Sequence, residues 1–418
     1  MSTRAPGTQP KRRSPIHAGG HVKRFAVWQG VVGVLLAACG SPSTPSTVPA
    51  APPACVDGVM IVGRAAVPCG VPSPTVATAT PPVATATTTA SAAPPVADVP
   101  APSGPKPLAR GDGSPSDALL QEADKLFAAD DFAGAEAKYK AAMQKAPKDP
   151  APIVGFVRAR LAKEAVPTDY GSAPASPTLK AMVLELQRAT KLDDGYAPAH
   201  LELGRALLVQ GKADAAQTSL EKALSLDPSE PEAHSTLGIA RLAKGDIDGA
   251  VKALGRAAEL DPRSAPRQSN HGTALLSAGR VAEAIAAYQR ALRLAPNDPG
   301  TLNDLGTALL AENKPDEALG HLDKAAGLAP KNAAVKQNQG YAHQLKGELD
   351  AARALYEEAV QLDPTLVSGW INLGNVHAMK KDFAGARAAY DKAKAIDPDD
   401  PRVKTAYAEL AELEKAGK

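Results

Sequence analysis

Six prolines recur every 34 residues in the C-terminal half of this chain, and this period constrains the fold more than any other feature. They are Pro228, Pro262, Pro296, Pro330, Pro364 and Pro398. One alanine lies twelve residues before each of these prolines, and another lies five residues before. A glycine series from Gly204 to Gly374 keeps the same spacing. A period of this length predicts a repeat protein, in which each unit packs mainly on its neighbours.

The repeated positions resemble the tetratricopeptide repeat, whose pattern is W-x2-L-G-x2-Y, then A-x3-F, then P. The last copy matches most fully, with Trp370, Leu373, Gly374, Ala386, Tyr390 and Pro398. His377 stands where the pattern usually has tyrosine. The resemblance implies an all-α superhelical solenoid of helix-turn-helix units. Small residues at fixed places would let the two helices of each unit approach closely, and proline would end the second helix.

We count eight repeats between residues 116 and 400. Their ranges are 116–149, 150–196, 197–230, 231–264, 265–298, 299–332, 333–366 and 367–400. The second copy is longer because of an insertion from Lys163 to Pro177, which we expect to be a surface loop. It is either a neutral insertion at a turn or a functional contact centred on Tyr170. Residues 401–418 are predicted to form a capping helix, with Ala406, Leu410 and Leu413 on one face.

Residues 39–115 have the composition of a linker. Ala, Pro, Ser, Thr and Val dominate this stretch, and large apolar side chains are scarce. Such a sequence cannot bury enough apolar surface to offset the loss of backbone entropy, so we expect a disordered tether.

The first 38 residues have the layout of an export signal. Basic residues up to Arg24 precede an uncharged apolar run, Phe25 to Ala38, which is too short to span a bilayer comfortably. The run ends in Leu36-Ala37-Ala38-Cys39, which resembles the lipobox of bacterial lipoproteins. The resemblance implies that residues 1–38 are removed and that Cys39 is lipidated and anchors the protein to a membrane. Gly40 follows the cysteine, and the family's sorting habit then favours the outer membrane, with the protein facing the periplasm.

Two further cysteines, Cys55 and Cys69, flank the one strand-like stretch of the linker, Val56 to Arg64. In an exported protein this arrangement favours a small hairpin closed by a disulfide; two free thiols are the alternative.

Composition argues against several function classes. The six basic residues before Cys39 account for the positive net charge, and their removal would change it from +2 to −4. A strongly basic nucleic-acid-binding protein is therefore not expected, and an aromatic content of 4% argues against base stacking. No nucleophile, phosphate-loop or metal motif occurs, so we predict no enzyme activity, no cofactor, no metal and no small-molecule substrate. The pairs His200 with His234 and His343 with His377 follow the repeat register, which we prefer to metal binding.

A candidate binding face lies on the first helix of each repeat. The sixth place of the later repeats holds Asn270, Asp304, Asn338 and Asn372, and the ninth holds Thr273, Thr307, Tyr341 and Asn375. These places share one helix face. In some tetratricopeptide proteins an asparagine ladder there grips the backbone of an extended peptide, and an amide can both donate and accept hydrogen bonds. The alternative is that asparagine is merely tolerated on an exposed face.

We therefore expect a lipid-anchored outer-membrane protein that presents a repeat scaffold to a protein or extended-peptide partner. Its layout resembles that of lipoproteins that assist pilus or secretin assembly, or scaffold cell-wall enzymes. Two alternatives belong to other classes: a structural protein that associates with itself through its repeats, and an enzyme with an unrecognised site in the insertion or linker.

Overall fold

The structure, a computed structural model, describes residues 61–62, 65–66, 106–167 and 170–416. The expected signal peptide, the lipidation site Cys39 and most of the expected linker lie outside the described residues.

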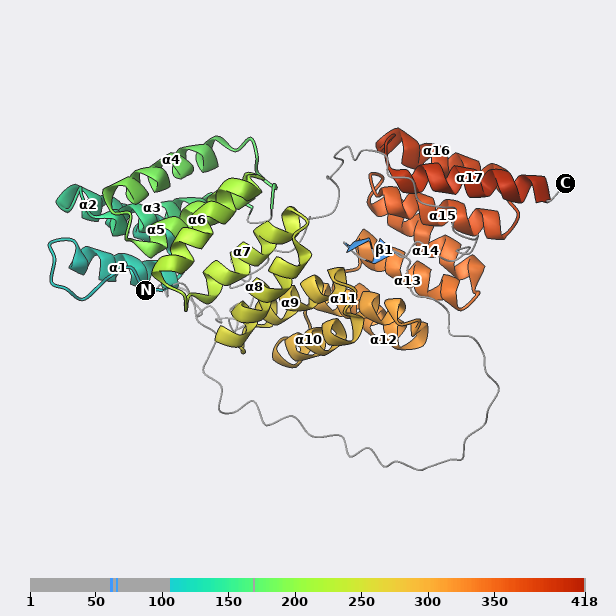
Figure 1. Cartoon of the computed structure of the whole chain (residues 1–418), viewed down its shortest axis with the longest axis horizontal. Coiled ribbons are helices and arrows are strands. Elements are labelled where there is room, and N and C mark those ends of the chain that lie inside the picture. Colours follow the sequence, from blue (N-terminus) through green and yellow to red (C-terminus); the bar gives the residue numbers. More distant parts are fainter. Residues whose placement is uncertain (1–60, 63–64, 67–105, 168–169, 417–418) are drawn as a thin grey trace, which may run out of the picture.

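Seventeen α-helices make up the described part of the chain from residue 106 onward (Figure 1). Their bounds are α1 Asp117–Ala128, α2 Phe132–Lys145, α3 Pro150–Lys163, α4 Pro177–Leu192, α5 Ala197–Val209, α6 Ala213–Leu226, α7 Pro231–Ala243, α8 Ile247–Leu260, α9 Ala265–Ser277, α10 Val281–Leu294, α11 Pro299–Ala311, α12 Pro315–Leu328, α13 Ala333–Leu345, α14 Leu349–Leu362, α15 Val367–Met379, α16 Phe383–Ile396 and α17 Pro401–Ala416. The expectation of an all-α solenoid of helix hairpins is confirmed.

The helices form two layers. Each helix packs on the next along the chain, and every odd-numbered helix also contacts the next odd-numbered one. The odd-numbered helices, the first of each repeat, therefore form one continuous layer, which we call the inner layer. The even-numbered helices lie beside it as the second layer, and Figure 1 shows the hairpins following one another from α1 to α17.

The turn between the two helices of a repeat uses one left-handed residue at a constant place. Glycine fills it in four repeats, at Gly211, Gly245, Gly279 and Gly347. Asp130, Asn313 and Lys381 adopt the same positive φ, although a Cβ disfavours it. Glycine and asparagine suit this backbone, whereas lysine adds local strain.

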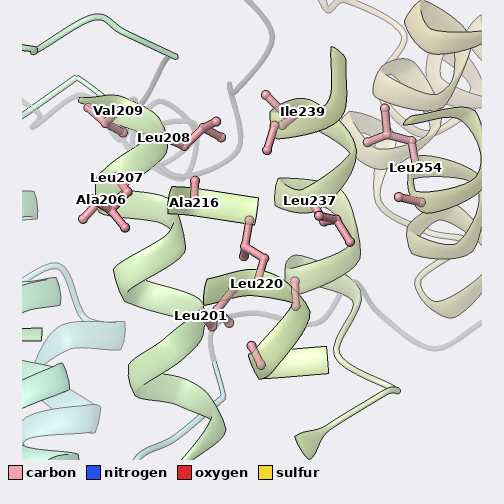
Figure 2. Close-up of a cluster of buried hydrophobic side chains, with 14 of the residues drawn as sticks. Leu201, Ala206, Leu207, Leu208, Val209, Ala216, Leu220, Leu237, Ile239 and Leu254 are labelled. Atoms are coloured by element: carbon pink, nitrogen blue, oxygen red, sulfur yellow. The ribbon is translucent and has the colours of Figure 1, made fainter. Parts of the chain in front are cut away.

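The predicted close approach of the paired helices is found at the glycine series. A Cβ on Gly306 would lie 2.7 Å from Cγ of Leu322, and one on Gly374 would lie 2.2 Å from Cε1 of Tyr390. The residue that faces the glycine is leucine in some repeats and tyrosine in others. Figure 2 shows the leucine-rich packing around α5 to α8, where Leu208, Leu220 and Leu254 are fully buried.

The insertion in the second repeat packs against the third. The Gly171 N–H donates to the Leu208 carbonyl at 3.1 Å, and the Ala173 N–H donates to the Val209 carbonyl at 3.3 Å. The Tyr170 hydroxyl donates to the Gly211 carbonyl at 3.3 Å. The loop therefore ties two repeats together, and Tyr170 already has a partner within the fold.

The last helix covers the end of the solenoid. In α17, Val403, Ala406 and Leu410 are buried against the eighth repeat. Leu413, which the sequence placed on the same face, is 45% exposed, because it lies beyond the edge of that repeat. No described helix combines the length and the apolar character needed to cross a membrane.

Part of the expected linker packs on the repeats. Leu108 is 3% exposed and belongs to the main hydrophobic cluster. Residues 106–115, which the sequence assigned to the linker, therefore belong to the packed structure, because one buried leucine and several hydrogen bonds hold this segment on the repeats.

Two short strands, β1 (Ile61–Val62) and β2 (Ala65–Ala66), pair antiparallel. They lie within the stretch for which the sequence favoured a hairpin, and they contact α11 and α9 respectively. Cys55 and Cys69 are outside the described residues, so their disulfide stays a prediction.

Candidate peptide-binding inner layer

The inner layer of repeats five to eight consists of α9, α11, α13 and α15, and it carries the predicted asparagine ladder. The three asparagines do not have the same surroundings. Asn338 is 2% exposed, whereas Asn270 and Asn372 are each 8% exposed. Asn338 is therefore the most deeply buried of the three.

Asn338 is a structural residue between two repeats. Its Nδ2 donates to Oδ1 of Asn303 and to Oγ1 of Thr307, each at 2.9 Å. Both acceptors belong to α11, so the amide holds the sixth and seventh repeats together. Because α13 packs directly on α11, Asn338 and Thr307 are used within the fold and are not available to a peptide.

Asn270 and Asn372 differ from Asn338. No side-chain hydrogen bond within the described part of the chain is found for Asn270 or Asn372, and both residues are largely covered. An amide in such a place has unused donors and acceptors for a backbone that reaches it. Of the three asparagines of the predicted ladder, Asn270 and Asn372 therefore remain candidates for peptide binding.

Two of the candidate residues at the ninth place, Thr273 and Asn375, accept hydrogen bonds from tyrosines of the second layer. The Tyr288 hydroxyl donates to Oγ1 of Thr273 at 3.1 Å, and the Tyr390 hydroxyl donates to Oδ1 of Asn375 at 2.7 Å. Burial raises the pKa of Tyr288 well above its ordinary value, so its hydroxyl stays protonated as a donor. Thr273 and Asn375 therefore fix the tyrosines of their own repeats.

The other two candidates in this region have mixed surroundings. Tyr341 is half-buried and packs against the apolar clusters on either side of it. Asp304 is half-buried and accepts a long contact of 3.4 Å from Nδ2 of Asn303. Both remain partly exposed on the inner layer between Asn270 and Asn372.

The inner layer of repeats two to five is charged instead. Arg158 Nε donates to Oε1 of Glu202 at 2.7 Å, and both side chains are buried. Arg205 also lies 3.6 Å from Glu202. Burial of the Glu202 carboxylate raises its pKa, but the positive charges of Arg158 and Arg205 lower it by more, so the pKa of Glu202 is below its usual value.

The same row of charges continues along the layer. Arg205 lies 3.7 Å from Glu232 of α7, and Arg267 of α9 lies 3.1 Å from the same carboxylate. Arg267 also pairs with Asp261 at 2.7 Å. Alternating charges therefore link repeats two to five, whereas amide hydrogen bonds link the sixth and seventh repeats.

Two aspartates of the first repeat also bind a backbone on the inner layer, and the sequence did not predict them. Asp124, at the ninth place of the first repeat, accepts the backbone N–H groups of Leu108 at 2.8 Å and Ala109 at 2.9 Å. Asp117 accepts those of Arg110 and Gly111 at 2.9 and 3.0 Å. The asparagine pattern does not include these aspartates, although they occupy the same helix face.

The histidine pairs serve their own repeats. His200 and His234 each contact the carbonyl six residues before them, at 3.1 and 2.9 Å. His343 and His377 each contact the carboxylate five residues after them, at 2.5 and 2.8 Å. The described residues contain no group of three potential ligands that could hold a metal ion.

A two-layered solenoid of helix hairpins, with polar groups along one continuous layer, defines a repeat scaffold of the kind that binds other proteins. Models of the tetratricopeptide repeat match residues 201–269 and 236–299 in one version, and 275–339 and 345–410 in another. The repeats within residues 201–339 and 345–410 are therefore tetratricopeptide repeats, and the solenoid has the fold of a protein–protein interaction scaffold.

Solved structures agree with this fold. The Cut9–Hcn1 hetero-tetramer of APC/C is similar with a TM-score of 0.53 and 21% identity, over 72% of this chain and 57% of that one. This chain thus spans little more than half of the length of that relative. The PilF protein of Pseudomonas aeruginosa gives a TM-score of 0.43 and 23% identity, over 52% of this chain and 98% of its own.

YrrB, described as a tetratricopeptide repeat protein with an unusual peptide-binding site, gives a TM-score of 0.35 and 23% identity, over 45% of this chain and 97% of its own. A search of curated protein sequences finds no match.

Proposed function

We propose that this protein is a non-enzymatic scaffold of the bacterial cell envelope, anchored by lipid at Cys39 to the outer membrane, with its repeats in the periplasm. The repeats bind an extended segment of a protein partner along the inner layer of repeats five to eight. The observation that carries the binding proposal is the pair of amides at Asn270 and Asn372 on α9 and α15 of the inner layer, for which no side-chain hydrogen bond is found within the described residues.

The chemistry of this surface suits a peptide backbone. Asn270 and Asn372 lie on α9 and α15, with the half-buried Asp304 and Tyr341 on the helices between them. Amide groups can pair with both the N–H and the C=O of a bound chain, whatever its side chains. Tyr341 offers an apolar ring and a hydroxyl, which suits selection among partners.

The binding proposal is tested with the variant Asn270→Ala/Asn372→Ala. Each amide hydrogen bond contributes about 0.5–1.5 kcal/mol, so the loss of both should weaken partner binding about tenfold. The matched control is Asn297→Ala, which removes an exposed asparagine from a turn outside the inner layer. Partners are captured from an envelope extract with each variant, and their affinity is then measured by calorimetry.

We expect the wild type and Asn297→Ala to bind equally and the double variant to bind weakly, with unchanged circular dichroism. Equal affinity of all three proteins would remove these amides from the binding surface. Asn338→Ala should behave differently, because it breaks a contact between repeats and should lower stability even without a partner.

The anchoring proposal rests on the sequence Leu36 to Cys39 and is tested by Cys39→Ser. The serine lacks the thiol that accepts lipid, so the variant should appear in the soluble fraction while the wild type pellets with membranes. Cys55→Ser is the matched control and should still pellet. A Cys39→Ser protein that remains with membranes after a carbonate wash would contradict lipid anchoring.

A further inference from the structure

Residues 106–111 run along the inner layer of repeats one to three before the first helix begins. They have no regular secondary structure. At one end Gly111 is held by Asp117 of α1, and at the other end Lys106 reaches the turn between α6 and α7, which ends the third repeat. The segment is bent where it meets Asp124 and Asp117, because one oxygen of each carboxylate accepts two successive N–H groups, and these point in opposite directions in a fully extended chain.

The repeats hold the backbone of this segment through charged groups. Asp124 and Asp117 each accept two successive N–H groups, from Leu108 to Gly111. Nη1 of Arg158, which is buried, donates to the Lys106 carbonyl at 3.2 Å. Hydrogen bonds to charged groups are stronger than neutral ones, so these contacts favour any peptide that can adopt the same backbone conformation.

The side chains of the segment add selectivity. Lys106 Nζ lies 2.7 Å from carboxylate oxygens of both Asp227 and Glu230. Arg110 pairs with Asp149 at 3.0 Å, and its guanidinium lies 5.1 Å from the centre of the Tyr196 ring.

Between these two basic residues, Leu108 is the buried apolar anchor. The surface therefore fits a basic residue, then leucine, then a second basic residue at alternate positions. Three of the four side chains that meet the basic residues at its two ends are acidic, so charge as well as shape defines the ligand.

We propose that the inner layer of repeats one to three is a binding site for a peptide of this pattern, and that residues 106–111 occupy it as an exchangeable ligand within the same chain. Exchange is favoured because the segment has one buried apolar anchor and its Lys106 side chain is 54% exposed. Segments with few buried contacts open locally at low free-energy cost. Release would uncover a second peptide site, separate from that of repeats five to eight.

The test uses the full-length protein and a labelled synthetic peptide with the sequence of residues 105–114. In the variant Lys106→Ala/Leu108→Ser/Arg110→Ala the internal ligand is weakened, so the peptide should bind, as measured by fluorescence anisotropy. The wild type should bind it at least about tenfold more weakly, because a tethered ligand competes at an effective concentration in the millimolar range. A peptide with the same three substitutions is the control and should bind neither protein.

A second measurement on the wild type covers the case in which the triple variant does not fold. Excess free peptide should speed hydrogen exchange of the amides of residues 108–111 without changing exchange in α9 to α17. If these amides exchange only with global unfolding, and the peptide has no effect at millimolar concentration, the segment is a permanent part of the fold and the proposal is wrong. A wild-type dimer that the triple substitution converts to monomer would also overturn it, because the segment would then occupy a neighbouring chain.

Discussion

At the scale of single residues, the same repeat place imposes one backbone conformation on different side chains. The turn residue has a positive φ of 72 to 78° at Gly211, Gly245, Gly279 and Gly347, and of 61° at Lys381. A lysine there carries the steric penalty of its Cβ, whereas glycine does not. The position within the repeat therefore determines the backbone conformation, and the residue type determines how much steric energy that conformation costs.

Lys381→Gly should stabilise the protein by about 0.5–1 kcal/mol, because it relieves the left-handed strain and offsets the greater freedom of glycine in the unfolded chain. Chemical denaturation measures the change. Lys381→Ala removes the same charge but keeps the Cβ, so it should bring no gain. An equal gain for alanine and glycine would assign the effect to charge instead of backbone strain.

At the scale of elements, neighbouring inner helices are joined by polar contacts whose chemistry changes along the solenoid. α3 and α5 are joined by the buried pair Arg158 and Glu202, whereas α11 and α13 are joined by the amides of Asn303 and Asn338. A buried ion pair costs desolvation, and the removal of one partner leaves an uncompensated charge. The charged half of the inner layer should therefore be the more sensitive to substitution and to pH.

Glu202→Gln should destabilise the protein by about 3–5 kcal/mol at pH 7, because Arg158 stays buried without a carboxylate. The pKa of Glu202 is lowered in the folded state, so its stabilising contribution is present above the unfolded-state pKa, near 4.3, and is lost as pH falls through the folded-state pKa. The difference between wild type and variant should thus shrink in acid. Urea unfolding across this pH range measures it.

The matched control is Glu259→Gln, which removes an exposed carboxylate paired with Arg256 on α8. Exposed pairs contribute little, so this variant should change stability by less than about 1 kcal/mol at any pH. A Glu202→Gln variant as mild as the control would show that the buried pair does not hold α3 to α5.

At the scale of the whole molecule, each helix packs mainly on its sequence neighbours, and each odd-numbered helix also packs on the next odd-numbered one. Stability in such a solenoid is approximately a sum of local terms. Damage in one repeat should therefore spread to its neighbours and fade beyond them.

Gly306→Leu tests this locality. The glycine meets Leu322 across the hairpin of α11 and α12, with no room for a side chain. The substitution should overpack that contact and cost about 1–3 kcal/mol. Hydrogen exchange should rise in repeats five to seven and change little in repeats two and eight. An equal rise in all repeats would indicate one cooperative core.

The sequence alone determined the repeat architecture of this protein, because its determinants are local. The period of 34, the glycine that faces Leu322 or Tyr390, and the proline that follows the second helix in most copies act within one hairpin or between adjacent ones. The six copies from residue 197 onward each carry enough of this pattern to predict two helices and their close approach.

Only the tertiary structure decided which inner-layer groups are free. Asn270, Asn338 and Asn372 occupy the same repeat place, yet Asn338 alone meets acceptors on the preceding inner helix, at Asn303 and Thr307. Asp117 and Asp124 likewise became recognisable as ligands of a backbone only once residues 106–111 were seen to lie across them. The physical reason is that periodicity specifies the direction of a side chain on its own helix, whereas its partner depends on how successive repeats are rotated and on which other segment lies against them.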